Sequence, residues 1–96
     1  MPKTKTNTAD TGLLDEAAKL ISGERMDQYG PPTDSLKRMA DFWTIILRDK
    51  LKPRTQITSM DVAMCMISFK LSRQINSNKH DNLVDIAGYA AIADLL

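Results

Sequence analysis

Apolar side chains recur at the three- and four-residue spacing of α-helices in four separate segments of the chain. These segments span residues 13–21, 36–47, 60–71 and 83–92, and polar residues separate them. Strand-like alternation with a period of two and internal repeats are both missing from the sequence. The pattern predicts an all-α fold, a compact four-helix domain over residues 11–96 that is expected to be oligomeric.

The residues before each apolar segment are of the types that begin helices. The expected N-caps are Asp10 or Thr11, Thr33, Thr58 with Asp61 three residues later as in a capping box, and Asp81 or Asn82. The second helix is expected to run to about Leu51. Residues 23–30 and the two prolines after them are interpreted as an ordered loop. Residues 1–10 are expected to form a flexible N-terminal arm.

The third segment is apolar on nearly every side of the predicted helix. This pattern is typical of a helix covered all round, so it predicts a central helix or an oligomer interface. Cys65 lies within this run and is expected to pack as a small hydrophobic side chain. Because a chain of 96 residues buries only a thin core, self-association is expected.

Composition narrows the class of protein. The formal net charge is +1, with 26% charged and 43% hydrophobic residues, which disfavours binding to duplex nucleic acid and argues against a wholly disordered chain. No apolar stretch reaches the roughly 20 residues of a membrane span, and the N-terminus lacks the apolar core of a signal peptide. With a single cysteine, these features favour a cytoplasmic protein without a membrane partner.

Lys70 and Arg73 are the first candidate binding residues. They stand three residues apart near the end of the third helix, so they lie on one helical face and together suit a phosphate group. The alternative interpretation is the solvated end of a core helix.

Arg25 and Tyr29 form the second candidate, in the segment that also contains Asp27 and Gln28. A ring that can stack on a nucleobase stands here beside a cation. The alternative is that these side chains fasten a loop to the core.

Asp81, Asp85 and Tyr89 form the third candidate, because their four-residue spacing places them in one row on the last helix. Such a row suits Mg²⁺, a nucleobase or a ribose, although Asp81 also suits the N-cap. His80 is the only histidine, too few for a zinc site, and no Ser-His-Asp arrangement or glycine-rich phosphate loop is present.

Four motifs in this chain resemble those of a family of small all-helical bacteriophage and prophage proteins of unknown function. The motifs are G-x-R-x-x-x-Y-G at 23–30, T-x-x-D-V at 58–62, K-x-x-R at 70–73 and D-x-x-x-D-x-x-G-Y at 81–89. The resemblance covers roughly residues 13–92 and implies a shared polar site on an all-α fold. The sequence departs from it at Asp34, Ser35 and Leu36, where an asparagine and an aromatic residue are more usual.

By analogy with other small oligomeric phage proteins, the first hypothesis is a cofactor-free binder that sequesters a cyclic (di)nucleotide signal of host antiviral defence in the bacterial cytoplasm. Its ligand-binding residues would be Arg25, Tyr29, Lys70, Arg73, Asp85 and Tyr89. The rival is a MazG-like Mg²⁺-dependent nucleoside-triphosphate pyrophosphohydrolase, which the fourth segment also resembles, with Asp81 and Asp85 holding the metal. The usual glutamate pairs of those enzymes are missing. A third possibility is a protein-binding inhibitor of a host factor.

Overall fold

The computed structural model describes residues 11–96, and these residues form an all-α fold without strands. The elements are α1 (Gly12–Leu20), α2 (Gly23–Tyr29), α3 (Pro32–Ile46), the 3-10 turn η1 (Arg48–Lys50), α4 (Ser59–Asn76) and α5 (His80–Asp94). The four predicted helices correspond to α1, α3, α4 and α5. The predicted arm, residues 1–10, lies outside the described residues.

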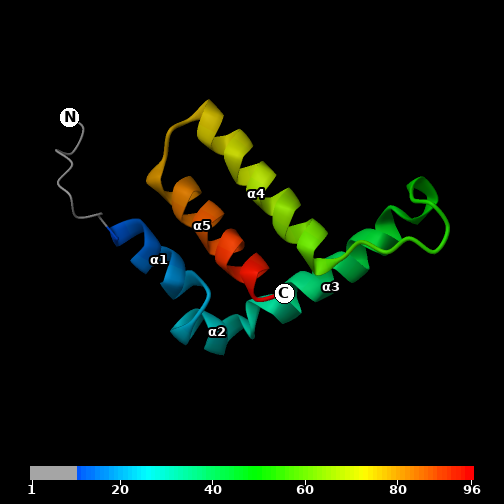
Figure 1. Ribbon diagram of the computed structural model, residues 1–96, viewed down its shortest axis with the longest axis horizontal. Coiled ribbons are helices and arrows are strands. Elements are labelled where there is room, and N and C mark those ends of the chain that lie inside the picture. Colours follow the sequence, from blue (N-terminus) through cyan, green and yellow to red (C-terminus); the bar gives the residue numbers. More distant parts are fainter. Residues whose placement is uncertain (1–10) are drawn as a thin grey trace.

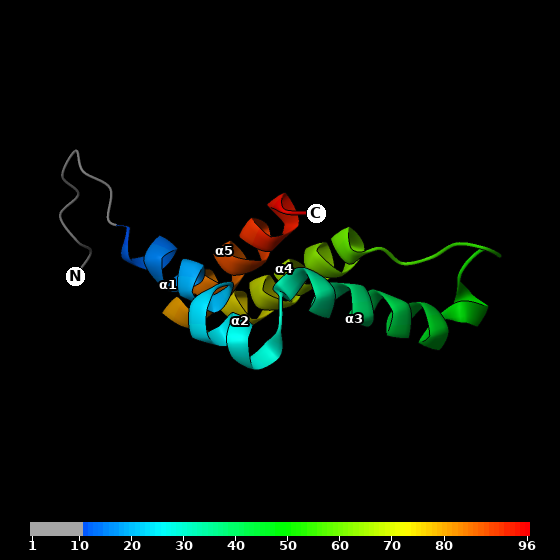
Figure 2. The ribbon, with the colours of Figure 1, turned by 90° about the horizontal axis from the view of Figure 1, so that it is seen from below.

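The helices α4 and α5 form an antiparallel pair to which the other elements attach (Figure 1). The helix α1 packs along α5, and α3 crosses the pair where α4 begins and α5 ends (Figures 1 and 2). The second half of α3 and its following loop extend beyond the pair, which contributes to extents of 53 × 32 × 21 Å. Among the helices of residues 11–96, none combines the length and the hydrophobicity that a bilayer-spanning segment needs.

The core lies where α3, α4 and α5 meet. Its buried residues are small or medium in size: Leu36, Ala40, Val62, Ala63, Ile92 and Ala93. Trp43, Met39 and Met66 are partly buried against them, whereas Met60 and Met64 are exposed. Because these buried residues are few and mostly small, the core is thin.

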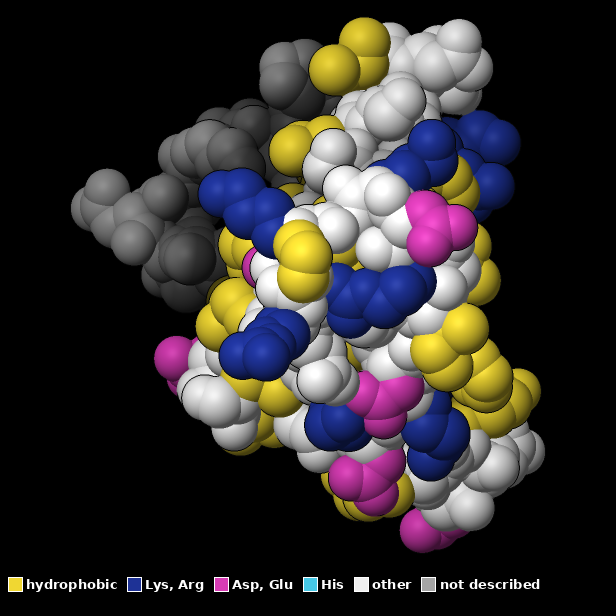
Figure 3. All heavy atoms as spheres, turned by 90° about the vertical axis from the view of Figure 1, so that its right-hand side faces the viewer, with side chains coloured by type: hydrophobic (Ala, Val, Ile, Leu, Met, Phe, Trp, Pro, Cys, Tyr) yellow, Lys and Arg dark blue, Asp and Glu magenta, His cyan; other side chains and the backbone are white. Residues whose placement is uncertain are grey.

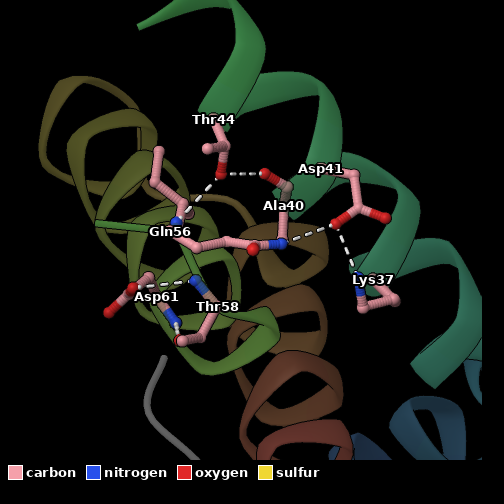
Figure 4. A network of polar contacts seen from close by, with 8 residues as sticks. Lys37, Ala40, Asp41, Thr44, Gln56, Thr58 and Asp61 are labelled. Atoms are coloured by element: carbon pink, nitrogen blue, oxygen red, sulfur yellow. Dashed lines mark hydrogen bonds and ion pairs between the residues drawn. The ribbon is translucent and has the colours of Figure 1, made fainter. Parts of the chain in front are cut away.

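Thr44 connects α3 to the loop that precedes α4 (Figure 4). Its buried hydroxyl donates to the carbonyl oxygen of Ala40 at 2.8 Å and accepts from the backbone N–H of Ile57 at 2.9 Å. On the surface nearby, the Gln56 amide donates to Asp41 at 3.0 Å. These bonds fix the entry to α4 against α3.

The capping box predicted at the start of α4 is confirmed (Figure 4). The backbone N–H of Thr58 donates to the Asp61 carboxylate at 2.9 Å, and the backbone N–H of Asp61 donates to the Thr58 hydroxyl at 3.1 Å. Two otherwise unpaired backbone donors are thereby satisfied, and the helix begins at a defined residue.

The prediction of a loop at 23–30 was wrong, because this segment forms the short helix α2. Gly23 and Gly30, with φ of +57° and +80°, provide the left-handed backbone on either side of it. The residues between them are compatible with a helix, and the prolines follow it instead of interrupting it. The turn signals therefore mark the ends of a helix.

Two other predicted boundaries differ. The helix α3 starts with Pro32 in its first turn, not after Thr33, because proline's missing N–H costs nothing there. It ends at Ile46 and the 3-10 turn η1 follows, close to the predicted end. The helix α5 starts at His80, and buried Asn82 bonds Gln74 at 3.3 Å instead of capping.

The prediction that the third helix is covered all round was wrong for a single chain. Of α4, only Val62 and Ala63 are buried, on the side toward α3 and α5. Met60, Met64 and Cys65 are exposed, so the thiol does not pack in the core of the chain. One chain has too few helices to surround α4.

Candidate functional site

A cavity of about 360 Å³ lies where α1, α2, α3 and α5 approach the middle of α4. Its apolar wall includes Leu20, Leu36 and Ile92. Its polar and aromatic lining includes five residues singled out from the sequence, namely Arg25, Tyr29, Lys70, Asp85 and Tyr89. The helices α2, α4 and α5 thus each contribute predicted side chains to the same cavity.

The helix α2 supplies Arg25 and Tyr29, which stand four residues apart and therefore share a face. The guanidinium carbon of Arg25 lies 5.3 Å from the centre of the Tyr29 ring, within range of a cation–π contact. Tyr29 is 65% exposed, so its ring stands at the rim of the cavity. A flat, partly solvated ring with a cation beside it can receive a nucleobase.

Lys70 of α4 and Asp85 of α5 form an ion pair across the helix pair, with Nζ and the carboxylate oxygen 2.9 Å apart. Their side chains are 14% and 30% exposed, so this pair is more sheltered from water than a surface pair. Among the described residues, Asp85 is the one carboxylate that lines the cavity. With Arg25 and Lys70 present, the lining carries one net positive charge.

Gly88 and Tyr89 complete the α5 side of the cavity. A Cβ built on Gly88 would lie 3.8 Å from Cδ1 of Leu20, an ordinary contact, so close helix packing does not demand glycine here. Tyr89, the next residue along α5, is partly buried against the core. The missing side chain at Gly88 leaves space in the wall of the cavity.

Arg73 lies outside this cavity, contrary to the idea that it acts together with Lys70. Its guanidinium carbon lies 4.6 Å from the centre of the Phe69 ring, and the residue lines a separate hollow at the end of α4 with Lys79. The physical reason is that α4 continues past the cavity, so Arg73 emerges one turn further on, where the side chain is exposed. Nζ of Lys70 lies 5.5 Å from the centre of the same ring, so the two cations flank Phe69, but only Lys70 lines the cavity.

Asp81 also lies outside the cavity. It is exposed in the first turn of α5, one turn before Asp85, and the two carboxylates do not line the same space. His80 beside it contacts the carboxylate of Glu16 on α1. Within residues 11–96, no three His, Cys, Asp or Glu side chains are grouped as a metal ion would require.

The sequence interpretation missed the contribution of α3. Ser35, Leu36 and Met39 line the cavity because the turn at Gly30 returns the chain toward α2 and α5. The sequence feature that could have indicated this contribution is the Gly-Pro-Pro turn, which places the start of α3 beside the end of α2. Ser35 and Leu36 belong to the stretch at which the sequence departs from the expected motif pattern, and no role in the site was predicted for them.

Comparison with known proteins places the chain among bacteriophage proteins. It is 34% identical over 83 residues to Gene 55 protein of Mycobacterium phage L5, covering 85% of this chain and 50% of that protein. It is 35% identical over 83 residues to Gene 55 protein of Mycobacterium phage D29, covering 85% of this chain and 51% of that protein. The chain thus spans about half the length of these curated relatives.

No solved structure matches the chain. The family model of DUF6378, a domain of unknown function, matches residues 12–96 and so includes all the helices described above. The chain therefore belongs to the DUF6378 family.

Proposed function

We propose that the chain binds a nucleotide in the cavity and, as a phage product, sequesters a cyclic (di)nucleotide signal of host antiviral defence in the bacterial cytoplasm without hydrolysing it. The observation that carries this proposal is the joint presence of Arg25, Lys70, Tyr29 and Tyr89 around one cavity. Cations suit phosphate oxygens and aromatic rings suit nucleobases, so this lining matches both parts of a nucleotide.

The size of the cavity supports a ligand of this class. Its volume of about 360 Å³ is at the lower end of the range of about 300–1,000 Å³ for small-molecule pockets. That space suits one nucleotide unit. The second unit of a cyclic dinucleotide would extend past exposed Tyr29 at the rim, where its base can stack on the ring.

Lys70 and Asp85 suit recognition of both the phosphate and the sugar. A lysine ammonium has three donors, so Lys70 can keep its bond to Asp85 and still donate to a phosphate oxygen. The second oxygen of Asp85 can accept from a ribose hydroxyl or a base N–H. The ion pair holds both groups in place before the ligand arrives, which reduces the entropy lost on binding.

The pyrophosphohydrolase is the second candidate, and the presence of Asp85 in the cavity favours it. Mg²⁺ held by Asp85 would have to displace Lys70, which is already paired with this carboxylate. Asp81, the other expected ligand, faces outside the cavity. Both features favour an anionic ligand over a metal-centred site. The protein-binding inhibitor would instead use the exposed apolar side chains.

The deciding experiment measures binding of linear and cyclic nucleotides by calorimetry, with Mg²⁺ present, for the wild-type chain and two variants. Lys70→Ala removes the sheltered cation, and Lys37→Ala removes the lysine of a more exposed Lys–Asp pair on α3. Loss of one charged contact is expected to weaken binding at least about tenfold, since hydrogen bonds to charged groups contribute roughly 1.5–3 kcal/mol. Only Lys70→Ala should show this loss.

The recovered nucleotide separates the candidate functions. Intact ligand released on heating supports sequestration, whereas a monophosphate with pyrophosphate establishes the enzyme and refutes the proposal. Equal affinity of the two lysine variants would refute the assignment of the site. No binding by any nucleotide would refute nucleotide recognition and direct attention to protein partners.

A further inference from the structure

The outward face of α4, defined as its exposed side from Met60 to Ile75, is apolar although the folded chain leaves it uncovered. Ile75 is 88% exposed, and most other large side chains of this face are between 42% and 47% exposed. Its exposed apolar residues are Met60, Met64, Leu71 and Ile75, whereas Cys65 and Phe69 are exposed on another side of the helix. A helix face bathed in water is normally polar, so this one is suited to a partner.

Charge is missing from the middle of this helix. Residues 62–69 contain no charged side chain, while 26% of the chain is charged. The buried centre of a protein interface is depleted in charge and enriched in methionine and aromatic residues. Met60 and Met64 are exposed methionines of this face.

The spacing along α4 indicates the shape of the partner. Met60, Met64, Ile67 and Leu71 follow one another at intervals of four, three and four residues, the spacing by which one helix packs lengthwise on another. Val62 and Ala63 face the core of the chain, so this second stripe is not used for folding. With 18 residues, α4 offers a seam about 27 Å long.

The projecting end of α3 adds a second uncovered apolar group. Phe42, Ile45 and Ile46 are 62%, 72% and 75% exposed on the half of α3 that extends beyond α4 and α5 (Figures 1 and 2). On the side from which α3 projects, hydrophobic side chains gather along one edge (Figure 3). Together the two groups expose an apolar area on the order of 800 Å², which is what each partner buries in a stable protein complex.

We propose that a second copy of this chain covers the outward face of α4 and the projecting end of α3. A charged partner would require complementary charges, which residues 62–69 lack, whereas an identical face offers the matching apolar surface. The net charge of +1 gives little repulsion between copies. Two α4 helices related by a two-fold axis form a self-complementary contact, the commonest arrangement in homo-oligomers. This association is independent of the proposed nucleotide ligand.

Sedimentation equilibrium over a range of concentrations tests the association, and substitutions on the stripe of α4 test the surface. We expect a mass of at least twice the 10.7 kDa of the chain. The double substitution Leu71→Lys and Ile75→Lys should return the mass to one chain, because it places two charges in the apolar contact.

The matched control is Leu14→Lys, because Leu14 is an exposed leucine, 61% exposed, on α1 and away from this surface. It should leave the mass unchanged. Circular dichroism checks that each variant is folded, and if the double variant unfolds, the single substitution Ile75→Lys at the 88% exposed position decides instead. A wild-type chain that is monomeric at every concentration overturns the proposal, even if it captures another protein. A folded variant with lysine on the stripe that associates as tightly as the wild type overturns it as well.

Discussion

The substitution Gly88→Ala tests whether this glycine is needed for close packing of the helices or for leaving space for a ligand. Gly88 is buried in the middle of α5 and lines the cavity. Glycine inside a helix costs about 1 kcal/mol relative to alanine, and the new Cβ would lie 3.8 Å from Cδ1 of Leu20, without a clash. The variant is therefore expected to be more stable than the wild type when no ligand is present.

The expected increase in the free energy of unfolding follows from helix propensity alone, since the contact of the new Cβ with Leu20 is an ordinary one. A gain of about 1 kcal/mol corresponds to a rise in Tm of roughly 4–8 °C for a domain of this size. The same methyl group occupies part of the cavity wall. If the ligand uses that space, its affinity should fall although the folded state is more stable.

The assay is thermal unfolding by circular dichroism with and without ligand, at one fixed protein concentration because self-association also shifts Tm. A lower Tm for the ligand-free variant would show that α1 and α5 approach more closely than the structure indicates. A higher Tm with unchanged affinity would refute the idea that Gly88 leaves space for the ligand. Both readings come from the same melting curves.

Three further predictions concern single side chains. Arg73→Ala should change nucleotide affinity less than about twofold, because the side chain faces away from the cavity; calorimetry showing a loss of tenfold or more would return it to the site. Thr44→Val should lower the free energy of unfolding by about 1–2 kcal/mol in urea titrations, because the N–H of Ile57 loses its acceptor; a change below about 0.5 kcal/mol would contradict this. Thr58→Ala should cost about 1 kcal/mol by removing the capping bond to Asp61, again by urea titration, and a stability equal to that of the wild type would contradict it.

The residues of the candidate site could be identified from sequence because core packing does not select cations and tyrosines in these patterns. Arg25, Tyr29, Lys70, Asp85 and Tyr89 all line one cavity. Their grouping could not be derived from spacing within single helices. It depends on how α2, α4 and α5 are placed against one another.

The separation of Lys70 from Arg73 shows the limit of the argument from spacing. Residues three apart are neighbours on a helix, so the sequence predicts that both cations face the same way. What each one meets depends on how far the neighbouring elements extend along α4. Both cations lie beside the Phe69 ring, but the cavity ends at Lys70, and Arg73 lies nearer the turn into α5.

The sequence by itself determined the all-α class, the four long helices and the capping box at Thr58, because hydrophobic periodicity and caps are local properties of the chain. Only the tertiary structure decided that the segment 23–29 is helical, which cations share a cavity and which side of α4 is covered. The sequence shows that α4 is apolar on several sides, but the side that the folded chain covers depends on contacts between residues far apart in sequence. Only the packing of the helices establishes those contacts.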